Sequence, residues 1–286
     1  MAPQPGRRSA IQTVLTCVPP CVQFMDVLQA QTLIQNASRG NRTASASKER
    51  IPMSDCLLAP DVYLCITEDA AVFLDLGRNQ YVGLEATYLP VLRSVMTSEN
   101  PGTLHTEELV DKLREAGLVC DDQRNGRPLI PTSVEVADTL LVPMDADVTA
   151  DVRSHVRPHH IANLFISYAL ASLSFRLCSL KRAVRRVETI KNRKARSGDT
   201  ALDLDAARRL VQIFEYLRPL LYTSQDKCLL DSLTLIEFLA RYDVFPTWIL
   251  GVRTGPFRAH SWVQHSRYVF NDSPGHTRAY VPILAI

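Results

Sequence analysis

Short runs of alternating or β-branched apolar residues open the interpretable part of the chain and predict a small sheet. VYLCIT and AVFLDL have the length and composition of strands, and Glu68-Asp69 forms the turn between them. RNQYVGLE then turns at Asn79 into a third short strand, Tyr81–Leu84. The pattern predicts three strands in succession, joined by tight turns.

Two stretches with helical spacing follow these strands. ATYLPVLRSVM places apolar residues on one face, with Pro90 in its first turn, where a proline is tolerated. TEELVDKLREAGL has Thr106 as a cap, acidic residues in its first turn and Gly117 at its end. Three strands followed by two helices predict a winged-helix-like domain over residues 53–120.

The second half of the chain has its helices first. Residues 121–158 contain DDQRNGRP and four prolines, and they predict a linker with one strand. Helical patterns then cover roughly residues 160–195, a second segment that ends near Leu221, and CLLDSLTLIEFLARY. The strand-like runs FPTWILGV, RAHSWVQ, RYVF and YVPILAI finish the chain. Helices first and an antiparallel sheet last predict an α+β domain over residues 159–286.

Residues 1–52 have the composition of a disordered extension. SRGNRTASASKER is polar and basic, and Pro19-Pro20 interrupts the apolar stretch that follows Arg7 and Arg8. That interruption favours a solvated tail over a targeting signal. No apolar run reaches the roughly 18 residues of a membrane-spanning helix, and the seven cysteines form no disulfide or zinc pattern. We therefore expect a cytoplasmic protein without a membrane span.

Charge is unevenly distributed along the chain. The net charge is +2, but residues 53–118 contain eleven Asp and Glu against four Lys and Arg. Phosphates would repel this acidic domain, which argues against a nucleic-acid-binding winged helix. Residues 176–196 contain nine Lys and Arg, and we interpret this run as a solvated helix face or a protein-docking surface. We therefore expect no nucleic-acid partner.

Cys228, His260 and Asp272 have the order and the setting of a cysteine-nucleophile triad. Cys228 opens an apolar helix, whose unpaired N–H groups favour a thiolate. His260 lies in the strand RAHSWVQ, on the same face as Trp262 and Gln264. Asp272 follows the next short strand, RYVF, where a carboxylate can orient the imidazole of its hairpin partner. Taken singly, a small buried cysteine and a satisfied core histidine are the alternatives.

Neither a metal site nor a cofactor site is expected. His155, His159 and His160 lie in a proline-flanked loop without Cys or acidic partners. The chain also has no Gly-rich phosphate-binding loop. We therefore expect no metal and no cofactor.

The C-terminal segment resembles the transglutaminase-like leader peptidases of lasso-peptide biosynthesis, the lasso B proteins. The resemblance rests on CLLDSLTL, GVRTGPFRAHSWVQ, VFNDSP and the ending YVPILAI. It implies a papain/transglutaminase-like cysteine peptidase in which Cys228 is the nucleophile, His260 the base and Asp272 the acid. Charge and spacing favour Asp272 over its neighbour Asn271 as the third member.

A second resemblance covers the first domain. VFLDLGRNQYVGLEA is similar to the precursor-recognition element of pyrroloquinoline-quinone chaperone-like domains. In that family the leader adds a strand to the edge of the third strand, against the last helix. The resemblance implies that Tyr81, Val82, Gly83 and Leu84 bind the leader beside the helix Thr106–Ala116. Ordinary core packing explains Tyr81 and Leu84 equally well.

Together the two resemblances imply a peptidase that binds the leader of a ribosomally synthesised precursor and cleaves it from the core. The core would then pass to a lasso cyclase, an asparagine-synthetase-like partner that supplies any ATP dependence. Two alternatives stay open. One is a non-catalytic scaffold that presents the leader to other enzymes, and the other is a transglutaminase-type acyl transferase, which passes through the same thioester.

Overall fold

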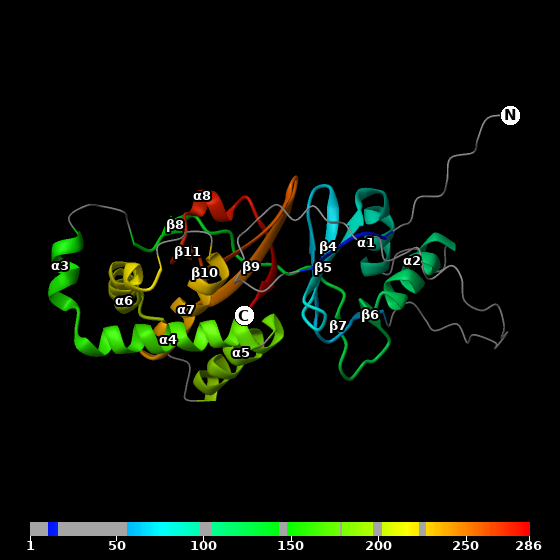
Figure 1. Cartoon of the computed structure of the whole chain (residues 1–286). Coiled ribbons are helices and arrows are strands. Elements are labelled where there is room, and N and C mark those ends of the chain that lie inside the picture. Colours follow the sequence, from blue (N-terminus) through cyan, green and yellow to red (C-terminus); the bar gives the residue numbers. More distant parts are fainter. Residues whose placement is uncertain are drawn as a thin grey trace. The chain divides into compact units, whose positions relative to one another are not determined.

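The structure, a computed structural model of the chain, describes residues 11–16, 56–97, 104–142, 148–177, 179–196, 202–222 and 227–286 (Figure 1). Apart from 11–16, the predicted extension over residues 1–52 lies outside this part. The described residues from 56 divide into two compact units, with the boundary between Pro131 and Thr132. None of the helices in the described segments is long and apolar enough to cross a membrane.

The first unit is built on an antiparallel sheet, which has four strands in the part that the structure describes. In sheet order these are β1 (Ile11–Thr16), β5 (Gln80–Glu85), β4 (Ala70–Asp75) and β3 (Val62–Ile66). A smaller sheet joins β6 (Val119–Cys120), β2 (Leu57–Leu58) and β7 (Arg127–Pro128). The helices are η2 (Ala86–Tyr88), α1 (Leu89–Thr97) and α2 (Leu104–Glu115).

Apolar side chains from the sheet and from both α-helices form the core of this unit. The almost completely buried members include Leu64, Phe73, Leu92, Leu109 and Leu113. Their spacing is two along the strands and three or four along α2, which are the periods at which residues share one face of a strand or a helix.

Gly117 ends α2 as the sequence predicts. Its φ of 72° is accessible to glycine without strain. The N–H groups of Gly117 and Leu118 donate to carbonyls of the last turn of α2 at 2.9 Å, which satisfies groups that the helix leaves unpaired. The sequence places the start of this helix at Thr106, two residues too far along the chain. In the structure α2 begins at Leu104, and Thr106 lies buried within its first turn.

The predicted order of three strands and two helices is present as β3, β4, β5, α1 and α2. The winged-helix assignment stays a prediction. β1 was not predicted: residues 11–16, which were expected to be part of a disordered extension, pair antiparallel with β5. The ladder runs from Ile11 opposite Leu84 to Thr16 opposite Gln80. One edge of β5 is therefore occupied by a strand of the same chain.

The second unit contains a sheet that has five strands within the described residues. In sheet order these are β12 (Val281–Ala285), β9 (Thr247–Thr254), β10 (Phe257–His265), β11 (Tyr268–Val269) and β8 (Thr139–Leu140). β9 and β10 form a long hairpin, and β8 pairs parallel with β11. The predicted antiparallel C-terminal sheet is thus confirmed apart from its short parallel edge strand.

The described helices of this unit are α3 (Val148–His155), α4 (Pro158–Leu177), α5 (Leu180–Arg196), α6 (Leu204–Leu217), η3 (Arg218–Leu220), α7 (Cys228–Ala240) and α8 (Pro274–Thr277). α7 is the central helix, because it packs against α4, α6 and β10 and its residues 230–239 are all buried (Figure 1). The sequence predicted one helix over 160–195 where the structure has two, α4 and α5.

Residues 121–158 do not form a separate linker. β7 belongs to the small sheet of the first unit, whereas β8 extends the sheet of the second. Thr132 donates to the carbonyl of Ile283 at 2.7 Å, and α3 packs against α6. The predicted linker is therefore divided between the two units, each of which fixes its share by hydrogen bonds and packing.

Candidate active site

Cys228 is the first residue of α7 and is half-buried. The N-cap residue, Lys227, makes no side-chain capping bond. N–H groups in the first turn of a helix lack partners within the helix and carry a partial positive charge. A sulfur at this position is therefore close to groups that stabilise negative charge.

His260 and Asp272 form a short hydrogen bond. His260 lies on β10, and its Nε2 is 2.5 Å from Oδ2 of Asp272, which follows β11. Both side chains are largely shielded from water, with exposed fractions of 13% and 16%. The Cys228 side chain lies near enough to the His260 ring to raise the pKa of the imidazole. Because Nε2 bonds to Asp272, Nδ1 is the ring nitrogen that can interact with the sulfur of Cys228.

These bonds set the protonation of the pair. Burial lowers the pKa of His260, but the hydrogen bond to Asp272 and the interaction with Cys228 raise it more, to about 9. Burial raises the pKa of Asp272, but the donors around its carboxylate outweigh this effect and hold the pKa below its usual value. Near neutral pH the structure therefore favours an imidazolium beside a carboxylate.

Asn271 has a different set of partners from Asp272. Its Oδ1 accepts from the backbone N–H of Val263 at 2.9 Å. Its Nδ2 donates to Asp231 at 2.9 Å and to Ser232 at 3.1 Å. Asn271 thus connects the end of β11 to β10 and α7, while its neighbour Asp272 contacts the imidazole.

Buried hydrogen bonds hold α7 against β10. Ser232, one turn after Cys228, donates to the carbonyl of Ser261 at 2.9 Å. The hydroxyl of Ser261 in turn accepts from the indole N–H of Trp248 at 2.8 Å. Cys228 and His260 lie on these two elements, so the bonds fix the positions of these two residues relative to one another. They are the physical reason why residues 32 positions apart meet.

Aromatic rings surround the imidazole. Trp262 lies nearly parallel to His260, with ring centroids 6.0 Å apart, and its indole N–H donates to Gln264 at 3.0 Å. The predicted common face of these three residues is therefore present. The Tyr280 ring is tilted against the His260 ring, with ring centroids 5.0 Å apart. Gly251, which pairs with His260 across the hairpin, leaves room for the Trp262 ring, because a Cβ there would lie 2.8 Å from it.

His276 is the site residue that the sequence did not reveal. Its Nδ1 lies 2.8 Å from Oδ2 of Asp272, and its ring meets the His260 ring edge-on at 4.6 Å. Among the described residues, His260, Asp272 and His276 are a group whose ligand atoms all lie within 4.8 Å of one another. Hydrogen bonds already join the three, which favours acid–base chemistry over metal binding.

The candidate leader-binding residues belong to the first unit, whereas Cys228, His260 and Asp272 belong to the second. Tyr81, Val82 and Leu84 are buried and Gly83 is half-buried. β1 pairs with β5 along this stretch. Tyr81 and Leu84 thus contribute to the folded unit, and the backbone groups on this edge of β5 are paired with the chain itself.

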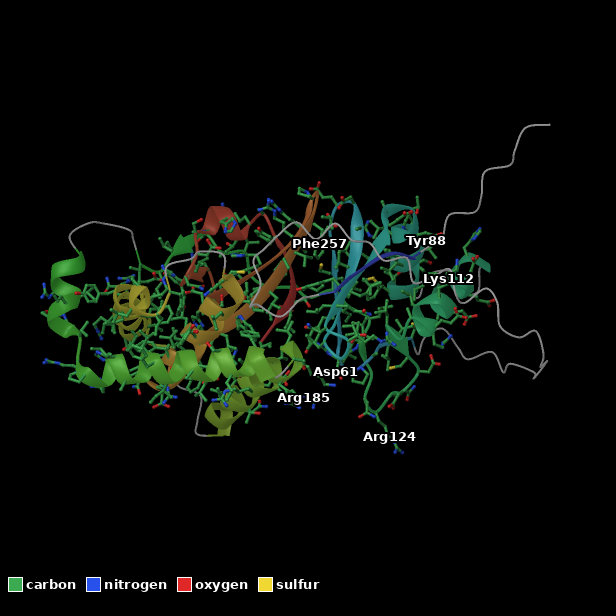
Figure 2. All side chains as sticks on the ribbon, viewed as in Figure 1. Asp61, Tyr88, Lys112, Arg124, Arg185 and Phe257 are labelled. Atoms are coloured by element: carbon green, nitrogen blue, oxygen red, sulfur yellow. The ribbon has the colours of Figure 1, made fainter. Side chains whose placement is uncertain are left out.

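The basic run includes a structural ion pair. Arg186 of α5 pairs with the buried carboxylate of Glu237 in α7. Arg185, labelled in Figure 2, is exposed on the same helix. Part of the basic run therefore anchors α5 to the central helix, and part faces solvent, as the sequence predicts for a solvated helix face.

Residues 169–285 match the transglutaminase-like superfamily. The matched range contains Cys228, His260 and Asp272. The second unit therefore contains a transglutaminase-like domain, related to the papain-like cysteine peptidases. Members of this superfamily are often cysteine-dependent enzymes and include both peptidases and acyltransferases. No curated protein and no solved structure matches the chain.

Proposed function

We propose that the chain is a cysteine peptidase that binds the leader of a ribosomally synthesised lasso-peptide precursor and cleaves it from the core. One observation carries the proposal: Cys228 begins α7 and interacts with the imidazole of His260, which bonds to Asp272. A thiol, an imidazole and a carboxylate in this relation form an activated nucleophile.

In the proposed reaction the Cys228 thiol gives its proton to Nδ1 of His260, and this transfer forms the imidazolium that Asp272 stabilises. The thiolate attacks the carbonyl carbon at the end of the leader, and the carbonyl oxygen becomes an oxyanion to which the backbone N–H of Cys228 donates. The imidazolium then gives its proton to the departing amine of the core. The leader remains on Cys228 as a thioester until water, deprotonated by His260, releases it as a carboxylic acid.

Asp272 keeps the imidazole oriented through both halves of this cycle. Its bond to Nε2 directs Nδ1 to the sulfur, and its charge stabilises the imidazolium. The pKa of about 9 at His260 supports this role, since the imidazolium then persists until the amine leaves. No cofactor is required for these steps.

Leader recognition is proposed for the β5 edge, with the leader added as a strand along Tyr81, Val82, Gly83 and Leu84. β1 supports strand addition there, because it is itself an extended segment that pairs with this edge. The same observation means that the leader and β1 compete for the edge.

The freed core would pass to an asparagine-synthetase-like lasso cyclase, which activates a side-chain carboxylate with ATP and closes the macrolactam on the new amine. The experiment mixes a lasso-peptide precursor that carries its leader with the wild type and with Cys228→Ala, and follows the mass of the precursor. We expect the wild type to release the leader and the variant to leave the precursor intact. The matched control is Cys120→Ala, which replaces a half-buried cysteine of the first unit and should cleave the precursor at the wild-type rate.

Acyl transfer to an amine is the second candidate, and the match to the transglutaminase-like superfamily favours it. Both reactions pass through the thioester, so the triad alone does not separate them. Adding a labelled primary amine does: hydrolysis yields a free leader acid, whereas transfer yields a leader amide. Unchanged precursor with both wild type and variant would instead identify a leader-binding scaffold.

A further inference from the structure

His276 contacts the triad without taking part in the proposed steps. Its Nδ1 donates to Asp272 Oδ2 at 2.8 Å, and the same oxygen accepts from His260 Nε2 at 2.5 Å. Oδ1 accepts from the N–H of Ser273 at 2.6 Å. The carboxylate is thus held by three donors, and the two imidazoles share one of its oxygens.

The local sequence places His276 at this point. Ser273 caps the short helix α8 by accepting from the backbone N–H of His276 at 3.2 Å, and Pro274 is its first helical residue. The turn brings His276 back over Asp272. Its ring also packs edge-on against Tyr280 at 5.4 Å, although about half of the side chain is exposed.

We infer that His276 is a positioning residue for the triad, which holds the Asp272 carboxylate in line with Nε2 of His260. The inference rests on the proposed function. Without His276, Oδ2 keeps only the bond to His260, and the carboxylate can turn about its one remaining backbone donor. A carboxylate that turns away stabilises the imidazolium less, and it directs Nδ1 less strictly toward Cys228.

Other titratable and charged groups also face His260. They are Cys228 of α7, Asp272 and His276 after β11, and Tyr280 before β12, whose ring also contacts the guanidinium of Arg253 of β9 at 5.6 Å. All of them except His276 remain when His276 is replaced. Loss of the donor should let the imidazolium deprotonate at lower pH. If His276 acted by charge repulsion on His260, its loss would have the opposite effect. The direction of the change therefore distinguishes a hydrogen-bond donor from a repelling charge.

Two substitutions separate the donor from the ring. His276→Phe keeps an aromatic ring against His260 and Tyr280 but has no donor. His276→Asn has a donor at the place of Nδ1 but no ring. The probe is iodoacetate, because its negative charge makes reaction with the Cys228 thiolate depend on the imidazolium beside it. The rate of alkylation at Cys228 is measured by peptide mass spectrometry from about pH 5 to about pH 10.

We expect His276→Phe to react about fivefold to tenfold more slowly near neutral pH, the size of a partly exposed bond to a charged group. On the alkaline side of the pH profile, the alkylation rate of His276→Phe should begin to fall about half a pH unit below the pH at which the wild-type rate falls. His276→Asn should stay within about twofold of the wild type, with its alkaline limb unmoved. His155→Phe, at the exposed end of α3, is the control and should match the wild type.

A wild-type rate and alkaline limb in His276→Phe would overturn the inference. So would an equal loss in both variants without a shift of the limb, since that result would assign His276 to packing alone. If Cys228 of the wild type reacted no faster than Cys120, the triad itself would be wrong, and the proposed function would fall with it. The experiment thus distinguishes the two failures.

Discussion

Replacing Asp272 with Asn removes a charge from the site while keeping its shape. The bond between Oδ2 and His260 Nε2 is 2.5 Å long, and neither side chain is more than 16% exposed, so water screens it little. A hydrogen bond to a charged group contributes about 1.5–3 kcal/mol. Because about 1.4 kcal/mol is a factor of ten in rate, we expect kcat/KM near neutral pH to fall about 10- to 100-fold.

The loss should appear mainly in kcat, because the carboxylate acts on the imidazole and does not bind the leader. Timed mass spectrometry of precursor cleavage gives kcat and KM, and thermal unfolding checks the fold. Asn271→Ala is the matched control from the next position. Asn271 bonds to Val263 and Asp231, so its loss should lower Tm while kcat/KM changes less than about threefold. If folded Asn271→Ala lost more activity than Asp272→Asn, the carboxylate would not be the triad's acid.

Three other perturbations have defined outcomes. Gly251→Ala should destabilise the protein by about 1–3 kcal/mol in thermal unfolding, since its Cβ would lie 2.8 Å from the Trp262 ring. Gly255→Ala is the control and should leave the stability unchanged, because a Cβ at position 255 has nothing within 4 Å. Equal Tm values for the two variants would contradict this packing. A chain that begins at residue 18 lacks β1, so labelled leader should bind it at least about threefold more tightly in fluorescence anisotropy, and an unchanged Kd would mean that β1 and the leader do not share the β5 edge. Because the pKa of His260 is raised from 6.5 to about 9, protonation of His260 stabilises the folded protein fully below pH 6.5, and this stabilisation is lost as pH rises through about 9. The difference in free energy of unfolding between the wild type and Asp272→Asn, measured in urea, should therefore shrink across that range. A difference that grew with pH would refute the assignment.

The sequence predicts which elements hold Cys228, His260 and Asp272, because each residue belongs to a local pattern. An apolar helix begins at Cys228, and strand alternation puts His260 on one face with Trp262. A hairpin return then brings Asp272 next to the imidazole. Local periodicity and turn signals are enough for these placements.

The parts that the sequence did not predict depend on contacts between distant residues or on a single turn. β1 pairs with a strand far along the chain, and nothing in IQTVLT specifies that partner. His276 contacts Asp272 because α8 folds back after Ser273. The Ser273-Pro274 pair predicts the start of a helix, but it does not predict that the Asp272 carboxylate is oriented toward His276. The break between α4 and α5 is hidden because helical spacing continues on both sides of it.

The central claim is that Cys228 forms a thioester with the leader. The most direct measurement mixes wild-type protein with precursor, stops the reaction with acid at short times, and determines the mass of the peptide that contains Cys228. We predict a transient increase equal to the leader acyl group, absent in Cys228→Ala, whose precursor stays intact. Cleavage by Cys228→Ala at the wild-type rate, with no adduct on the wild type, would contradict the account.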